Sequence, residues 1–283
     1  MRRLFSFLLA CLLGCSAFAY GEEKITYRNV ELKDNGTFLD MGTTKIGDMD
    51  KFRRFLGQNP ELQRVDMYQT RISLKTMEEL RAQFPLINFG CTFSFVRGSI
   101  STNTEAYSTF NRLSDPRYPS SRFEALKYCP DIKALDLGHH KIKELEFLLP
   151  LSQMRILILA VCKIDNIDVL STLKDLEYLE LFNNDIMDLS PLAELQNLQH
   201  LNLCHNPFTD ITPLLKLKNL KRLWLSKNHL TDEQIDLLEK SLPDCSFFYS
   251  WGDCTGGGWR SEGPYYKTIM KIFKSGVYEP FPQ

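Results

Sequence analysis

The sequence predicts an α/β solenoid, with a curved parallel β-sheet on the concave face and 3-10 and α-helices on the convex face. The first observation behind this prediction is the distribution of leucine, because 29 of the 43 leucines lie between Ile132 and Asp244. The second is that apolar residues in this region recur with a fixed period of 22 residues. A fixed period of this length is typical of proteins built from stacked repeats.

Composition excludes several classes of protein. The chain has 283 residues, is 43% hydrophobic, and carries 34 Lys and Arg against 35 Asp and Glu. A net charge of −1 argues against a strongly basic nucleic-acid binder, and the apolar content argues against a disordered chain. We therefore expect a folded protein that does not bind nucleic acid.

The N-terminus has the pattern of a secretory signal peptide covering residues 1–19. Two arginines precede the apolar run 4–13, and Ala17-Phe18-Ala19 is a small-residue cleavage site. The run is too short to span a membrane, so no transmembrane segment is expected. Leu12-Leu13-Gly14-Cys15 also resembles a lipobox, so a lipid anchor at Cys15 is the alternative to free secretion. Both readings place the mature chain outside the cytoplasm, secreted or at the cell envelope or surface.

The central repeat is regular over residues 132–244. Its blocks begin at Ile132, Met154, Leu176, Leu198 and Leu220. Each opening follows L-x-x-L-x-L-x-x-N, whose alternation of apolar and polar residues predicts a short strand. The ninth position is occupied in turn by His140, Cys162, Asn184, Asn206 and Asn228. An amide at this position can bond the backbone of neighbouring coils, so we expect a ladder of side chains inside the turn.

These residues resemble the leucine-rich repeat family, in particular the 22-residue class of internalin-like bacterial secreted and surface proteins. The stretches 188–192 (DLSPL) and 210–214 (DITPL) match the convex turn of that class. The resemblance implies recognition of a partner rather than catalysis. It covers residues 36–251, which we expect to form one solenoid.

The remaining elements follow in chain order. Residues 20–35 are an N-terminal segment, and weaker copies of the repeat begin near Leu39 and Val65, with helices expected at 50–56 and 76–84. Residues 96–121 form an irregular insertion, either a degenerate coil or a projecting loop. A helix is expected at 232–241. Residues 252–283 are a C-terminal cap, whose amphipathic stretch 265–273 is expected to cover the open end of the stack.

The concave face is the predicted binding site. Neighbouring strands lie roughly 5 Å apart, so the outward residues of successive repeats form one contiguous patch. We predict that its partner-binding residues are Ile156, Ile158, Tyr178, Phe182, His200, Asn202, Arg222 and Trp224. Exposed aromatic residues beside Arg are typical of protein-binding hot spots. Two alternatives are that these residues only improve packing across strands, or that a terminal segment folds over them and buries the patch.

Catalytic, metal and cofactor sites are not expected. The five histidines are spread over different coils or strand ends, and no paired C-x-x-C or H-E-x-x-H occurs. Cys245 and Cys254 flank the final turn, so they are the candidate disulfide, with two buried thiols as the alternative.

The predicted function is binding of a protein or peptide ligand, from a host or a bacterial surface, by a non-catalytic protein. The first alternative is an effector with an enzymatic activity on host or envelope components. The second is an envelope protein that organises other surface components.

Overall fold

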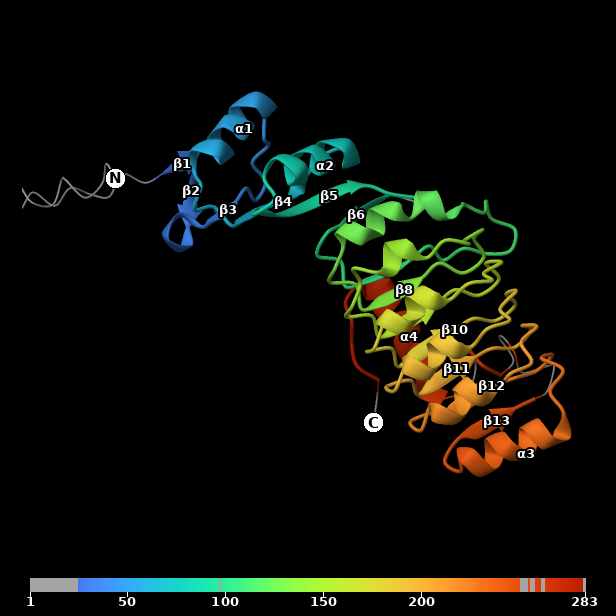
Figure 1. The fold of residues 1–283 in the computed structure, drawn as a ribbon. Coiled ribbons are helices and arrows are strands. Elements are labelled where there is room, and N and C mark those ends of the chain that lie inside the picture. The colour runs from blue at the N-terminus through green and yellow to red at the C-terminus, as the bar shows by residue number, and fades with distance from the viewer. Residues whose placement is uncertain (1–24, 97, 250–253, 255–257, 261–262, 282–283) are drawn as a thin grey trace, which may run out of the picture.

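The computed structural model describes residues 25–96, 98–249, 254, 258–260 and 263–281, which form a curved solenoid (Figure 1). The predicted signal peptide and Cys15 lie outside the described residues. Successive coils run from β3 (Phe38–Asp40) to β13 (Ser246–Phe248), with strands on one side and helices on the other. The predicted fold class is therefore confirmed.

The strands form two sheets rather than one. The first has the order β1-β2-β3-β4-β5-β6, and the second runs in parallel from β7 to β13. The other strands of the first sheet are β1 (Thr26–Tyr27), β2 (Val30–Lys33), β4 (Arg64–Arg71), β5 (Asn88–Ser94) and β6 (Ser99–Ser101). The other strands of the second sheet are β7 (Ala106–Ser108), β8 (Ala134–Asp136), β9 (Ile156–Ile158), β10 (Tyr178–Glu180), β11 (His200–Asn202) and β12 (Arg222–Trp224).

The break between the sheets falls in the irregular stretch 96–121. There β5 turns back into β6 as an antiparallel hairpin, and β6 ends the first sheet. Gly98 allows this turn, because its φ of +98° is a conformation that L side chains rarely adopt. The next strand, β7, pairs in parallel with β8 and begins the second sheet. The stretch therefore contains both the end of one sheet and the first strand of the next.

Helices cover the convex side, and their length follows the length of the coil. The longer coils hold α1 (Met49–Gln58), α2 (Leu74–Gln83) and α3 (Asp232–Ser241), close to the predicted bounds. One 3-10 helix, η1 (Asp34–Gly36), lies in the turn between β2 and β3. The shorter coils hold the others: η2 (Ser120–Arg122), η3 (Glu124–Tyr128), η4 (Glu146–Leu148), η5 (Asp168–Thr172), η6 (Ser190–Glu194) and η7 (Thr212–Lys216). Proline in the first turn of η6 and η7 fits there because that position needs no N–H donor.

One hydrophobic core runs through both halves of the solenoid. It extends from Tyr27 in β1 to Leu242 after α3, and the inward leucines of every regular coil are fully buried in it. The break in the sheet therefore does not divide the core. Burial of this column drives the stacking of the coils, since a single coil cannot bury its own apolar edges.

The asparagine ladder is present inside the turns. Asn184 donates from Nδ2 to the carbonyls of Leu159 and Leu181, at 2.9 and 3.0 Å. Its Oδ1 accepts from the backbone amides of Cys162 and Ile164, both at 3.1 Å. At the first ladder position, the Nδ1 of His140 accepts from the amide of Tyr118 at 3.3 Å, and its Nε2 bonds the Thr109 hydroxyl at 3.1 Å. These side chains satisfy backbone groups that the tight turn would otherwise leave buried and unpaired.

Replacing Asn184 with Ala is expected to lower the free energy of unfolding by about 3 kcal/mol or more. The change leaves three buried backbone groups without partners, since the Leu181 carbonyl keeps its bond from Asn206, and each such group costs roughly 1 to 3 kcal/mol. Urea denaturation measures the loss. Asn197→Ala is the matched control, because Asn197 is exposed and makes one bond, and its effect should stay within about 0.5 kcal/mol. Equal losses for the two variants would contradict the ladder's role.

Candidate functional site

The structure brings the predicted binding residues together on the concave face of the second sheet. Tyr178 pairs in register with Ile156 and with His200, which in turn pairs with Arg222. The next outward column pairs Asn202 with Trp224. The predicted grouping of these side chains is thus present in the structure.

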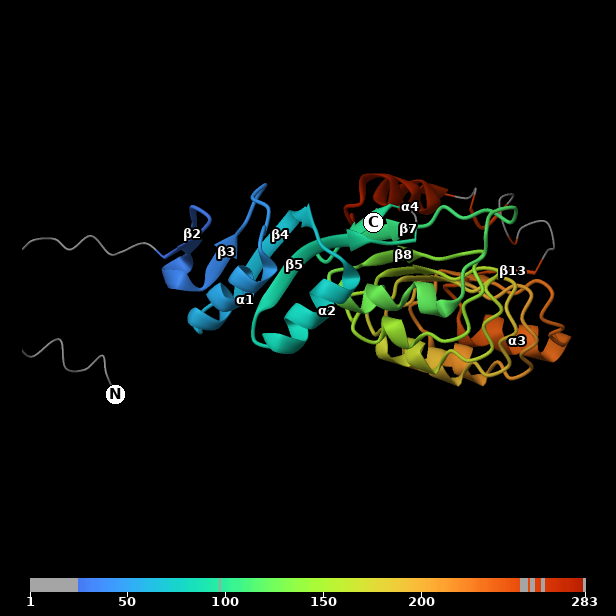
Figure 2. The same ribbon diagram turned by 90° about the horizontal axis from the view of Figure 1, so that it is seen from above.

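These residues do not form an exposed patch, so the expectation of an open concave surface is wrong, and the structure has the alternative in which a terminal segment buries the patch. Six of the eight predicted residues are buried, and Phe182 and Arg222 are only partly exposed; the buried six are Ile156, Ile158, Tyr178, His200, Asn202 and Trp224. They are covered by what we call the C-terminal segment, the described residues from 254 to 281. Figure 2 shows its helix α4 (Gly263–Ser275) over β7 and β8, on the side of the sheet opposite the 3-10 helices.

The position of this segment corrects the predicted cap. The stretch 265–273 is helical as expected, but it lies across the concave face instead of over the open end of the stack. The last coil, with α3 and β13, occupies that end. The reason is apolar complementarity, because the second sheet presents apolar side chains on its concave face as well as toward the main core.

The concave face and the C-terminal segment form a second hydrophobic core, the concave core. It consists of Ala106, Ala134, Ile156, Ile158, Ala160, Tyr178, Cys204, Trp224, Cys254, Trp259, Ile269, Ile272 and Phe273. Small side chains on β7 and β8 face α4, and α4 contacts β7 directly. Larger aromatic side chains on β10 and β12 meet the turn that carries Trp259. Small sheet residues thus leave room for the helix, and large sheet residues fill the space beneath the turn.

Aromatic contacts define the centre of the concave core. The ring of Trp259 lies 4.8 Å from that of Tyr178 and 4.9 Å from that of Trp224. The guanidinium of Arg222 lies 5.1 Å from the Trp224 and Trp259 rings and 4.8 Å from the Tyr265 ring. The residues predicted to bind a partner therefore make aromatic and cation–π contacts, but with other residues of the same chain.

A buried ion pair fastens the segment to β10. The Glu180 side chain has no exposed surface, and its carboxylate accepts from Arg260 at 2.6 Å and from the Trp259 indole at 2.8 Å. The Glu180 charge raises the pKa of Arg260 above its ordinary value. At the other end of the segment, the amide of Tyr278 donates to Glu105 at 3.2 Å, and Lys133 pairs with that same carboxylate at 2.8 Å.

Replacing Arg260 with Met is expected to lower the free energy of unfolding by about 3 to 5 kcal/mol, because the buried Glu180 carboxylate loses its countercharge. Denaturant unfolding followed by tryptophan fluorescence measures the change. The double variant Glu180→Gln with Arg260→Met should recover part of the loss. Lys271→Met is the control, since Lys271 makes an exposed pair with Glu279 in the same segment. If Arg260→Met costs no more than Lys271→Met, the buried pair does not hold the segment.

His200 is buried beneath the segment as a neutral imidazole. Its Nδ1 accepts from Arg222 Nε at 3.0 Å, and its ring lies 4.2 Å from that of Tyr265. Burial, aided by the charges of Arg222 and Lys221, lowers the pKa of His200 to about 3. The ordinary pKa of about 6.5 applies once the chain unfolds. Between these two values, only the unfolded state carries the proton.

The free energy of unfolding should therefore fall as pH drops below about 6.5, by up to about 1.4 kcal/mol per pH unit from His200 alone. Urea denaturation at several pH values between 7 and 4.5 measures this slope. His200→Asn should make the slope shallower, because the amide oxygen can still accept from Arg222 while the titrating group is gone. If the slope of stability against pH is the same in the variant and the wild type, His200 has the same pKa in the folded and the unfolded chain, which would contradict this account.

The first sheet leaves part of the concave surface open. Figure 2 shows α4 over the second sheet and not over β3 to β5. We define the open concave patch as Lys33, Phe38, Asp40, Arg64, Asp66 and Tyr68. The side chains of Lys33 and Arg64 are 53% and 54% exposed. Sequence reasoning missed this patch, although Leu39-Asp-Met and Val65-Asp-Met-Tyr repeat the strand pattern and place the intervening residues outward.

The side chains of the open concave patch hold one another in place. Arg64 makes two bonds to Asp66, Nε to Oδ1 at 2.9 Å and Nη2 to Oδ2 at 2.6 Å. Its guanidinium also lies 5.0 Å from the Phe38 ring. The Tyr68 ring fits over Gly90, where an added Cβ would lie 2.5 Å from the ring. A side chain at position 90 would therefore displace the ring.

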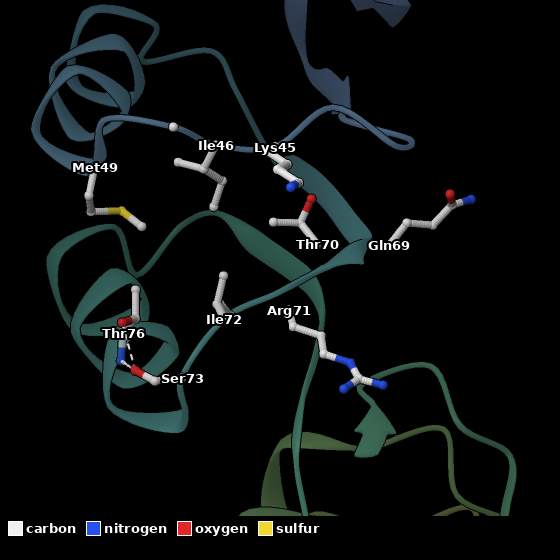
Figure 3. Close-up of a pocket in the computed structure, with 10 residues that line it drawn as sticks. Lys45, Ile46, Met49, Gln69, Thr70, Arg71, Ile72, Ser73 and Thr76 are labelled. Carbon is white, nitrogen blue, oxygen red and sulfur yellow. Dashed lines mark hydrogen bonds between the residues drawn. The ribbon is translucent and has the colours of Figure 1, made fainter. Parts of the chain in front are cut away.

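A groove lies beside the loops that follow β3 and β4. It has a volume of about 610 Å³. Figure 3 shows Ile46, Met49 and Ile72 pointing into it, whereas Gln69 and Arg71 point away. Ser73 lies at one side of the groove. Its hydroxyl caps the N-terminus of α2 by accepting a hydrogen bond from the Thr76 amide at 3.0 Å.

The cysteines differ from their predicted pairing. Cys245 packs against the main core, whereas Cys254 belongs to the concave core on the other side of the sheet. The sheet therefore separates the two predicted disulfide partners. The six cysteines of the described chain carry free thiols in this structure. Within the described ranges, no group of three or more His, Cys, Asp and Glu is placed to hold a metal ion.

Comparison with known proteins agrees with the coil geometry. Residues 196–240 match the model of a family described as leucine rich repeats (2 copies). No relative was found among the curated proteins. Across the part of the chain that the structure describes, no helix is long and apolar enough to cross a membrane.

Three solved structures illustrate the similarity in fold. An internalin (inlF) from Listeria monocytogenes is 20% identical over 75% of this chain and 46% of its own, with a TM-score of 0.42. Internalin C2 from the same organism is 25% identical over 75% and 80%, with a TM-score of 0.42. The ectodomain of the Arabidopsis receptor kinase HAESA, in complex with a peptide hormone, is 20% identical over 63% and 32%, with a TM-score of 0.39. This chain thus spans less than half of the first of these proteins, and its partner does not follow from the likeness.

Proposed function

Starting from a chain with the leucine-rich repeat fold, we propose that it works outside the cytoplasm as a non-catalytic binding protein. In this proposal, the open concave patch binds a protein or peptide partner from a host or bacterial surface. One observation carries the choice of surface: the C-terminal segment occupies the concave face of the second sheet, while it does not cover the first sheet, where Lys33 and Arg64 are exposed. The signal-like N-terminus, with free secretion or a lipid anchor at Cys15, supports the location.

The chemistry of the open concave patch suits recognition of a polypeptide. Phe38 supplies an aromatic surface, Arg64 supplies a planar donor group, and Tyr68 combines both properties. The two hydrogen bonds that Arg64 donates to Asp66 fix the guanidinium before a partner arrives. A partner then loses little affinity to the ordering of these side chains. Paired charges of both signs favour a polar, mixed-charge partner over a strongly acidic or basic one.

The eight residues first predicted to bind a partner have a different role in this proposal. They bind the chain's own C-terminal segment, which contacts the sheet as a bound peptide would. A partner could reach Tyr178 and Trp224 only by displacing Trp259 and breaking the buried pair of Glu180 and Arg260. That displacement would expose a charge and several large rings together, and the segment is therefore expected to stay in place.

Arg64→Ala combined with Phe38→Ala is expected to weaken binding by roughly 700-fold, since hot-spot side chains each contribute on the order of 2 kcal/mol and about 1.4 kcal/mol corresponds to a tenfold change. The measurement begins with capture of partners by the mature chain from host and bacterial surface extracts. The dissociation constant for a purified partner is then measured for each variant. Only variants whose denaturation midpoint matches that of the wild type are compared.

Lys163→Ala is the control for this experiment, because Lys163 is an exposed residue of a regular coil that pairs with Asp185 across the surface. Its dissociation constant should match that of the wild type. Unchanged affinity in the double variant, with weakened affinity in Trp224→Phe, would place the partner on the covered concave face and refute the proposed surface.

A further inference from the structure

Two thiols meet where the C-terminal segment touches the sheet. Cys204 follows β11 on the concave side and has no exposed surface, and Cys254 is 3% exposed. Both belong to the concave core, and the Cys254 side chain lies beside that of Cys204. They are 50 positions apart in the chain, and neither takes part in the proposed binding surface.

One side chain positions the backbone of both cysteines. Asn202 donates from Nδ2 to the carbonyl of Cys254 at 3.0 Å, and its Oδ1 accepts from the amide of Cys204 at 3.1 Å. Asn202 is itself fully buried. The approach of the two sulfur atoms is therefore set by anchored backbone on each side and not by the rotamers of the cysteines alone.

The other cysteines of the described chain are not placed to compete for Cys254. Cys91, Cys129 and Cys162 are buried in the main core, and Cys245 packs against that core. The second sheet lies between the main core and the concave core. Cys204 is the cysteine that shares the concave core with Cys254.

We propose that Cys204 and Cys254 form a disulfide that fastens the C-terminal segment to the concave sheet. The oxidant is a disulfide-bearing protein or a low-mass disulfide of the compartment where the exported chain folds. The thiolate of one cysteine attacks that disulfide and releases one thiol, giving a mixed disulfide. The thiolate of the second cysteine attacks the mixed disulfide and releases the other thiol. Two cysteine thiols are oxidised, one external disulfide is reduced to two thiols, and the two protons pass to those thiols.

The order of folding and oxidation follows from burial. Burial, with the neighbouring Cys254, raises the pKa of the Cys204 thiol, and the thiolate is the reactive form. A docked segment therefore reacts slowly. The bond therefore forms as the segment docks, before burial of the two thiols is complete. Once formed, it keeps the second sheet closed and leaves the open concave patch as the available concave surface.

Mass spectrometry tests the bond directly in the wild-type chain. One sample is made by export through an oxidising compartment, and another is refolded with oxidised glutathione. Each is alkylated in denaturant without reductant and then digested. The peptide containing Cys204 should be linked to the peptide containing Cys254. Quantitative alkylation of both cysteines in both samples, or a link from Cys254 to Cys245, would overturn the proposal. A link in the refolded sample alone would also overturn the proposal, because the bond is proposed to form where the exported chain folds. The proposed binding surface would stand in either case, since the open concave patch does not contain these cysteines.

Limited proteolysis gives a second test with matched variants. Reduction of the oxidised wild type should speed cleavage within the C-terminal segment by about tenfold or more, because the cross-link restrains opening of the segment. Cys254→Ser should be cleaved at one rate with and without reductant. Cys245→Ser should behave as the wild type does. Equal sensitivity to reductant in Cys254→Ser and the wild type would contradict the bond.

Discussion

The structure depends on burial of both faces of the second sheet. Along β8 to β12, the inward leucines pack into the main core, while Ala134, Ile156, Tyr178 and Trp224 present apolar surface on the opposite side. A parallel sheet that is apolar on both faces must be covered on both faces. The coils supply one cover by stacking. The C-terminal segment supplies the other, and its position determines which concave surface remains for a partner.

The features that repeat could be predicted from the sequence. The strands, the asparagine ladder and the convex turns recur every 22 residues, so each copy supports the assignment of the others. Helix α3 falls within the predicted 232–241, because Thr231 and Gln234 form a capping box that marks its start. Short-range patterns of this kind depend on neighbouring residues and neighbouring coils.

The features that occur once could not be predicted in the same way. The ion pair of Glu180 with Arg260, and the shared position of Cys204 and Cys254 in the concave core, join distant parts of the chain without any period. Apolar outward residues on β9 to β12 fit a binding patch and an internal interface equally well by sequence. The amphipathic stretch 265–273 was a signal of the interface, yet nothing local distinguished the end of the stack from its concave face. The open concave patch was missed because the weaker N-terminal coils lack the regular spacing.

The C-terminal segment covers the concave face of the second sheet and leaves that of the first sheet uncovered, while one main core lies beneath both sheets. The most direct test of this account is amide hydrogen exchange of the full chain, followed peptide by peptide by mass spectrometry. Peptides from α4 should exchange as slowly as those from β9 to β12, since they are protected by the same packing. Exchange of α4 at the rate of an unfolded chain, with β9 to β12 still protected, would contradict the account, because the concave face would then be open in solution.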